Sequence, residues 1–111
     1  MNEKIVAESK NFVGKLRKSL KMVNDDNLFV ISVKGDGKSV NSISVATYDE
    51  MKVGSLAREK LPSLYKSADK LLEMSSKQYS GISSVIIMLT DEFETDVFQD
   101  GQVLRICNLD A

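Results

Sequence analysis

The carboxylates between residues 91 and 100 are the densest group of chemically active side chains in the sequence. Asp91, Glu92, Glu94, Asp96 and Asp100 carry the oxygen ligands that hard cations such as calcium prefer. Their spacing lacks the ligand rhythm and the glycine of an EF-hand loop, so we predict no metal site. Two interpretations stay open: solvated charges that discourage aggregation at a strand edge, and an acidic patch, centred on Asp91, Glu92, Glu94 and Asp96, that binds a partner protein.

The tripeptide Gly37-Lys38-Ser39 is similar to the end of a phosphate-binding loop, in which backbone N–H groups and a lysine hold phosphates at the start of a helix. That motif requires a glycine five residues before Gly37, where this chain has Ser32, and a helix afterwards. The residues that follow alternate between polar and apolar, which is typical of a strand. We therefore predict a hairpin turn here and no nucleotide site.

Two copies of the Ser-x-x-Lys pattern begin at Ser63 and Ser67. In serine acyl enzymes this spacing places a lysine one helical turn from a nucleophilic serine. A chain of 111 residues with fourteen serines and twelve lysines is expected to contain such matches by chance, and the companion motifs of those enzymes are missing. The pattern therefore does not predict catalysis.

The chain has no histidine and a single cysteine, Cys107, which limits the chemistry available near neutral pH. General acid-base catalysis would need a strongly shifted carboxylate, lysine or cysteine, and a zinc site would lack ligands. We therefore predict that the protein is not an enzyme and uses no metal or other cofactor. A lone cysteine without a disulfide partner is typical of the reducing cytoplasm.

The composition is that of one compact soluble domain spanning residues 1–111, with 42% apolar and 28% charged residues. A formal charge of −1 gives no overall field that would attract nucleic acid or an anionic membrane. The first ten residues contain acids and no apolar signal region, and the longest aliphatic run, Val85 to Leu89, is too short to span a membrane. We expect a cytoplasmic protein that binds neither nucleic acid nor membrane.

The first half of the sequence predicts a helix followed by a hairpin. Residues 3–23 place apolar side chains on one helical face and lysines on the other. Residues 28–34 form a nearly continuous apolar run, which predicts a strand buried on both faces. Residues 40–45 alternate between apolar and polar, which predicts a second strand with one face in water.

The second half predicts another helix and three strands. Thr47 and Glu50 form a Thr-x-x-Glu capping box, so we expect a helix over residues 48–77, with Pro62 kinking or dividing it. Residues 82–90 predict a central strand. Residues 93–99 and 102–109 alternate on either side of Asp100-Gly101, which predicts a second hairpin.

The expected fold class is α/β, or α+β, with the order α-β-β-α-β-β-β in a single domain. We predict a mostly antiparallel five-stranded sheet with two long helices that cover at least one of its faces. The expected core consists of Phe12, Leu16, Leu20, Val30, Val33, Ile43, Val45, Leu61, Leu64, Leu71, Ile86, Met88, Leu104 and Ile106.

This element order, with a Gly-Asp-Gly turn in the first hairpin and Asp100-Gly101 before the last strand, resembles the roadblock family of dynein light chains and GTPase regulators. The resemblance covers nearly the whole chain and rests on topology and two turns. It implies a five-stranded sheet, and a two-fold dimer, formed by the second helix and an edge strand, that acts as a scaffold.

Together these patterns predict a small non-enzymatic interaction module that self-associates, as a homodimer or larger assembly, and binds a further protein. A sheet leaves open edges, and helices on one side leave apolar surface to cover. Large side chains outside the expected core are the candidate contacts, namely Tyr65, Met74, Phe93 and Phe98. The alternative is a monomeric acidic inhibitor or decoy that presents residues 91–100 to a basic partner protein, in a contact that salt would weaken.

Overall fold

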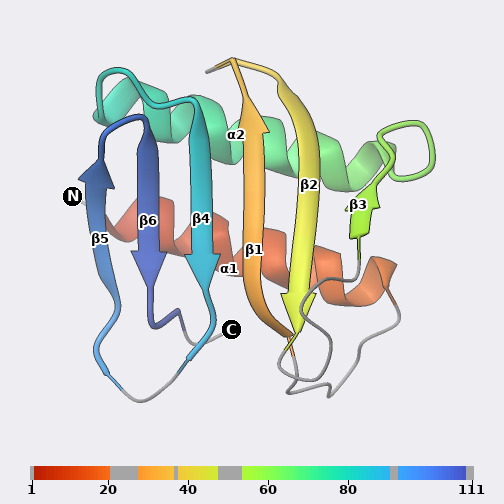
Figure 1. Ribbon diagram of the computed structural model, residues 1–111, viewed down its shortest axis with the longest axis horizontal. Helices are drawn as coiled ribbons and strands as arrows, with labels where there is room; N and C mark the ends of the chain where they lie inside the picture. The colour runs from red at the N-terminus through yellow and green to blue at the C-terminus, as the bar shows by residue number, and fades with distance from the viewer. Residues whose placement is uncertain (1, 21–27, 37, 48–53, 91–92, 110–111) are drawn as a thin grey trace.

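Two helices pack against the same face of a single mixed sheet (Figure 1). This computed structural model describes residues 2–20, 28–36, 38–47, 54–90 and 93–109. The α+β class and the predicted order of two helices and five strands are confirmed, and a sixth strand of three residues extends the sheet.

Helix α1, Glu3–Ser19, forms because its apolar residues recur on one face. Ile5, Phe12, Val13 and Leu16 are fully buried on that face. Arg17 and Lys18 lie in the last turn, where positive charge interacts favourably with the helix dipole. The helix ends at Ser19, a few residues before the predicted boundary at residue 23.

Strands β1, Leu28–Gly35, and β2, Val40–Thr47, form the predicted hairpin. The Asp36 carboxylate accepts hydrogen bonds from the backbone N–H groups of Ser39, at 2.9 Å, and Lys38, at 3.0 Å. These bonds lower the pKa of Asp36, because they favour its charged form. The predicted hairpin turn is thus confirmed, and its own aspartate closes it.

The second helix starts later than predicted. Strand β3, Gly54–Leu56, pairs with β2, and helix α2 runs over Pro62–Gln78. The prediction of a helix that begins after a capping box at Thr47 was wrong, because residues 54–56 form β3 and Thr47 ends β2; Glu50 lies outside the described residues. Pro62 does not kink the helix but begins it, since a first-turn residue needs no N–H donor and proline already has a helical φ.

The last three strands are β4, Ser84–Met88, β5, Asp96–Asp100, and β6, Val103–Cys107. The sheet order is β3-β2-β1-β4-β6-β5, with β4 and β6 parallel and the other neighbours antiparallel. Strand β6 lies between β4 and β5, so β5 is an edge strand, and β3 lies at the opposite edge (Figure 1). Gly101, with φ of 61°, makes the predicted tight turn between β5 and β6.

The core lies between the helices and one face of the sheet. Most of the predicted core residues are buried there, and Leu20 and Leu61 are partly buried against it. The predictions for Val30, Ile86 and Met88 were wrong, because these side chains are only half-buried, on the opposite face. Among the described residues, the apolar runs of β1 and β4 are covered by helices on one face, and there Ile31, Val33, Val85 and Ile87 are fully buried.

An ion pair in a nearly buried position joins the two helices. Glu8 of α1 lies 3.1 Å from the Lys70 amine of α2 and accepts a 3.1 Å hydrogen bond from Asn11. Burial raises the pKa of Glu8, but the bonds from Asn11 and Lys70 and the positive charges of Lys70 and Lys15 outweigh it, so the pKa lies below its ordinary value. The charged form of Glu8 therefore stabilises the folded state.

We expect this pair to make stability depend on acidity. Because the pKa of Glu8 is lowered in the folded state, the ionised group stabilises the fold fully at pH values above the ordinary glutamate pKa. This stabilisation is lost as the pH falls through the lowered pKa. Glu8→Gln should therefore unfold more easily than the wild type at about pH 7, and the difference should shrink at about pH 3, as measured by urea unfolding. In the matched control, Glu73→Gln, an exposed pair with Lys77 is lost and little should change. An equal difference at both pH values would contradict the assignment.

Candidate interaction surface

The sheet face opposite the helices is uncovered among the described residues, and we call it the open face. Strand side chains alternate between the two faces, so the register and the burial of each strand assign residues to it. Its members are Ser42, Ser44 and Ala46 of β2, Val30, Ser32 and Lys34 of β1, Ser84, Ile86 and Met88 of β4, Val103, Arg105 and Cys107 of β6, and Asp96, Phe98 and Asp100 of β5.

The middle of the open face carries small polar and half-buried apolar side chains. Ser32 of β1 is paired with Ser44 of β2 on one side and with Ile86 of β4 on the other. Val30 lies beside Met88 in the same ladder. Small side chains next to half-buried apolar ones allow another flat surface to approach closely.

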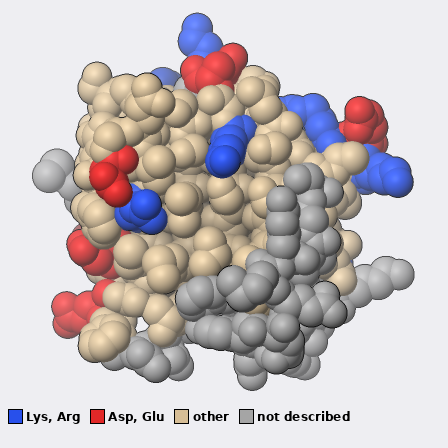
Figure 2. Space-filling view, viewed as in Figure 1, with Lys and Arg blue, Asp and Glu red and all other residues tan. Residues whose placement is uncertain are grey.

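Charge on the open face lies mainly on the strands at one end of the sheet. Arg105 of β6 forms a 3.1 Å ion pair with Asp100 of β5, and Asp96 is exposed on the same strand. Lys34 is an exposed cation on β1. Figure 2 shows a surface that is mostly uncharged in its described part, with most of its charged side chains toward the margin.

The candidate contacts predicted from the sequence do not form one site. Phe98 and Asp96 lie on the open face of β5, and Phe98 is 41% exposed. Phe93 is 71% exposed and Glu94 is exposed, both ahead of β5. Asp91 and Glu92 lie outside the described residues, and Met74 is partly buried against the core.

The prediction that Tyr65 is a contact residue was wrong, because its side chain is only 1% exposed. The Tyr65 hydroxyl donates a hydrogen bond to the carbonyl of Leu56 and accepts one from the backbone N–H of Ile43, at 3.2 Å. Tyr65 thus holds β2 and β3 to α2. The sequence did not reveal this role, because residues 54–56 were expected to belong to the second helix and not to a strand that Tyr65 could bond.

Sequence reasoning missed the central residues of the open face by assigning Val30, Ile86 and Met88 to the core. A continuous apolar run does not say which of its two faces a helix will cover. The signal that distinguishes the faces is the set of serines that share this face across neighbouring strands. Ser32, Ser42 and Ser44 are such residues, and they are only partly buried.

A polar cluster near the start of α2, which we call the α2–β2 joint, connects this helix to strand β2 through Arg58 and Asp69. Arg58 donates to the Asp69 carboxylate at 2.8 Å and to the Val40 carbonyl at 2.7 Å, and its guanidinium lies 4.8 Å from the centre of the Tyr65 ring. Asp69 also accepts the Val40 N–H, at 2.7 Å. A hollow of about 740 Å³ lies beside this joint and is lined by Arg58, Glu59, Pro62, Ser63 and Lys66. The charged groups of Arg58 and Asp69 are satisfied by each other and by β2, so they hold the helix to the sheet.

Metal sites, membrane spans and known relatives would be further indications of function. No group of three or more potential metal ligands gathers among the residues that the structure describes. In the same residues, no helix is long and apolar enough to cross a membrane. Comparison of the chain with protein-family models, with curated proteins and with solved structures finds no match. The geometry of the open face is therefore the basis for a functional hypothesis.

Proposed function

We propose that this protein is a small non-enzymatic interaction module that self-associates through the open face of its sheet. The observation that carries the proposal is the placement of both helices on one face, which leaves half-buried Val30, Ile86 and Met88 without cover from the described residues. Apolar surface of this kind is stabilised by removal from water. A second copy would supply a third layer and close the open face.

The size of the face supports a second copy as its occupant. The molecule measures 35 by 33 Å in the plane of Figure 1, which shows the sheet face-on, and 21 Å in depth. A stable dimer commonly buries about 800 Å² on each partner, and a face of this width provides an area of that order. Two sheets packed face to face form a layer about 10 Å thick, and the small side chains around Ser32 and Ser44 favour such an approach.

The test is the molar mass in solution, measured by light scattering over a concentration series at low and at high salt. We expect a dimer at both, because an apolar contact is nearly insensitive to salt. Ile86→Glu places a charge at the middle of the open face, where it would be buried on association, and should shift the protein to monomer. The folded monomer should persist, because Ile86 points away from the helices and Arg105 lies beside it in register.

The matched control is Lys66→Glu, which changes charge at an exposed position of α2 on the helical side. This variant should dimerise as the wild type does. A wild type that stays monomeric at high micromolar concentration would contradict the proposal and favour the acidic inhibitor or decoy. Equal dimerisation of Ile86→Glu would exclude the open face as the contact.

A further inference from the structure

The outer side of β5 has backbone groups without partners in the described part of the chain. Asp100 and Val103 flank the two-residue turn of the β5–β6 hairpin, so they form a hydrogen-bonded pair. The pairs alternate along an antiparallel ladder, so Phe98 and Asp96 also bond to β6. The N–H and C=O groups of Val97 and Gln99 consequently point away from the sheet. Such an edge is a template for another strand.

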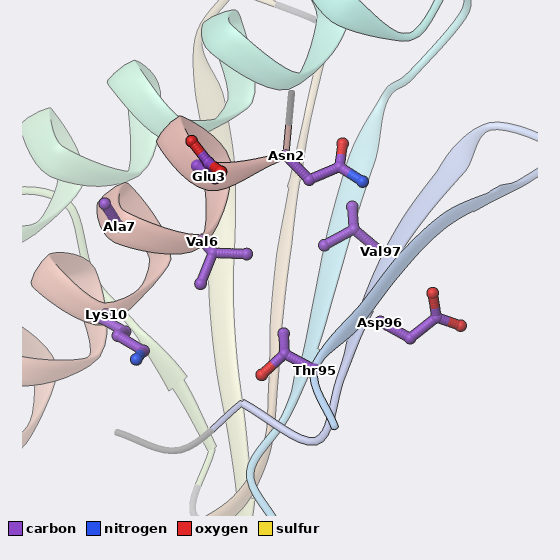
Figure 3. Close-up of a pocket in the computed structure, with 8 residues that line it drawn as sticks. All are labelled: Asn2, Glu3, Val6, Ala7, Lys10, Thr95, Asp96 and Val97. Carbon is purple, nitrogen blue, oxygen red and sulfur yellow. The ribbon is translucent and has the colours of Figure 1, made fainter. Parts of the chain in front are cut away.

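A hollow of about 460 Å³ lies directly beside this edge, between β5 and α1. Figure 3 shows Val6 of α1 and Val97 of β5 pointing toward each other across it, and Asp96 pointing away from the helix. Ala7 and the exposed Lys10 continue the helical wall. The hollow therefore has an apolar floor on the helix-facing side of the strand, where alternate side chains of an added strand would point.

Both walls of the hollow are fixed by contacts to the rest of the molecule. The Asn2 side chain, just before α1, accepts hydrogen bonds from Gln78, at 3.0 Å, and from the Tyr79 hydroxyl. The start of β5 is held by Asn108, whose carbonyl accepts from Thr95 at 3.0 Å and whose amide donates to the Glu94 carbonyl at 3.2 Å. A ligand would thus bind a preformed edge, with little cost for ordering the protein.

The negative charges of β5 decide whether a second copy of this chain or a different protein pairs with its edge. If two β5 strands paired antiparallel over their full length, Asp96 of each would lie opposite Asp100 of the other, and like charges in that position are destabilising. Asp96 is exposed and has no ion-pair partner among the described residues. A basic side chain opposite Asp96 gives a favourable cross-strand pair instead.

From this geometry we propose that the β5 edge binds an extended peptide segment of another protein as an additional antiparallel strand. The segment carries a large apolar residue opposite Val97, which enters the hollow, and a lysine or arginine at the next position, opposite Asp96. Main-chain hydrogen bonds to Val97 and Gln99 provide affinity, and the two side chains provide selectivity. This surface is separate from the middle of the open face, so the proposal does not rest on self-association.

The probe is a labelled peptide, acetyl-Ser-Lys-Thr-Val-Leu-Lys-Ser-amide, titrated with the full chain and followed by fluorescence anisotropy. In the expected register its leucine lies opposite Val97 and its second lysine opposite Asp96. Serine in place of the leucine should weaken binding about tenfold or more, because the apolar contact is lost. The Val97 and Gln99 amides should exchange rapidly with solvent in the free protein and slowly with peptide bound.

Two pairs of variants test the edge and the charge. Gln99→Pro removes an outward N–H without removing a bond to β6 and should reduce affinity about tenfold, whereas Gln99→Ala, which loses the same side-chain bonds to Ser80 and Gly101, should bind as the wild type does. Asp96→Lys should weaken binding about fivefold and prefer a peptide with glutamate at the second lysine. Glu94→Lys, outside β5, is the control for overall charge.

Several outcomes would overturn the proposal. These are no binding at millimolar peptide, unchanged affinity in Gln99→Pro, or preference of Asp96→Lys for the original peptide. Protection of Val97 and Gln99 that appears without peptide and grows with protein concentration would show a second copy at the edge instead. Ile86→Glu should still bind the peptide, so failure of the dimer and failure of the edge site are distinguishable.

Discussion

Replacement of Gly35 by alanine is expected to destabilise the protein by about 3 kcal/mol, near the upper end of the usual cost of overpacking. Gly35 ends β1, where its N–H donates to the carbonyl of Ser83 at 2.9 Å. A Cβ atom here would lie 2.1 Å from the carbonyl oxygen of Ser39 and 2.8 Å from a methyl carbon of Leu72. The leucine can rotate, but the Ser39 carbonyl belongs to the hairpin, so the clash can be relieved only by moving the turn.

The measurement is urea unfolding of the variant beside Gly14→Ala. Gly14 lies within α1, and a Cβ there meets no atom within 4 Å. Because glycine is a weaker helix former than alanine, Gly14→Ala should stabilise the protein by about 0.5 to 1 kcal/mol. The same substitution is thus expected to act in opposite directions at the two sites. A Gly35→Ala variant within 0.5 kcal/mol of the wild type would show that the hairpin yields easily.

The hairpin positions could be predicted from the sequence because their signals are local. The turn at Asp36 forms hydrogen bonds within three residues, and the turn at Gly101 uses a positive φ that glycine adopts without strain. The α1 face and the alternation of β2 are local as well. Each of these features depends on residues close in sequence, so the pattern determines them without knowledge of the tertiary fold.

The second helix shows where local signals fail. Residues 57, 61, 64, 68 and 71 have helical spacing, yet the chain pairs Gly54–Leu56 with β2 and begins α2 only at Pro62. That outcome depends on contacts distant in sequence, chiefly from Tyr65 and Arg58 to β2. The local signal for this helix start was Pro62, because proline is common at the first helical position; the helical spacing around it was taken to predict a kink inside a longer helix instead.

The candidate surfaces were predictable only in part for the same reason. Phe98 and Asp96 were predicted as candidate contacts, and the structure places both on β5 with exposed side chains. The open face itself depends on which side of the sheet the helices cover. The hollow beside Val97 depends on how α1 lies across the edge strand, and no pattern within either element records that.

Removal of the Tyr65 hydroxyl is expected to cost about 2 kcal/mol, because it leaves two backbone groups, the N–H of Ile43 and the carbonyl of Leu56, without their partner. Tyr65→Phe keeps the ring that fills the core and the contact with Arg58. Ile43 and Leu56 are register partners of β2 and β3, so the hydroxyl joins the two strands that α2 must cover. Its loss should release β3 before the rest of the sheet unfolds.

Urea unfolding and amide exchange together test this role. Tyr79→Phe is the matched control, since the hydroxyl it removes bonds, among the described residues, to the Asn2 side chain and to no backbone group, and about 1 kcal/mol or less is expected there. In Tyr65→Phe the amide of Leu56 should exchange faster while those of β4 stay protected, because local opening exposes only the segment that has lost its contact. If Tyr65→Phe and Tyr79→Phe lose equal stability and β3 exchange is unchanged, the hydroxyl does not hold the strand. A selective release of β3 would show that this short edge strand depends on α2, and its departure would expose the β2 edge to pairing with other chains.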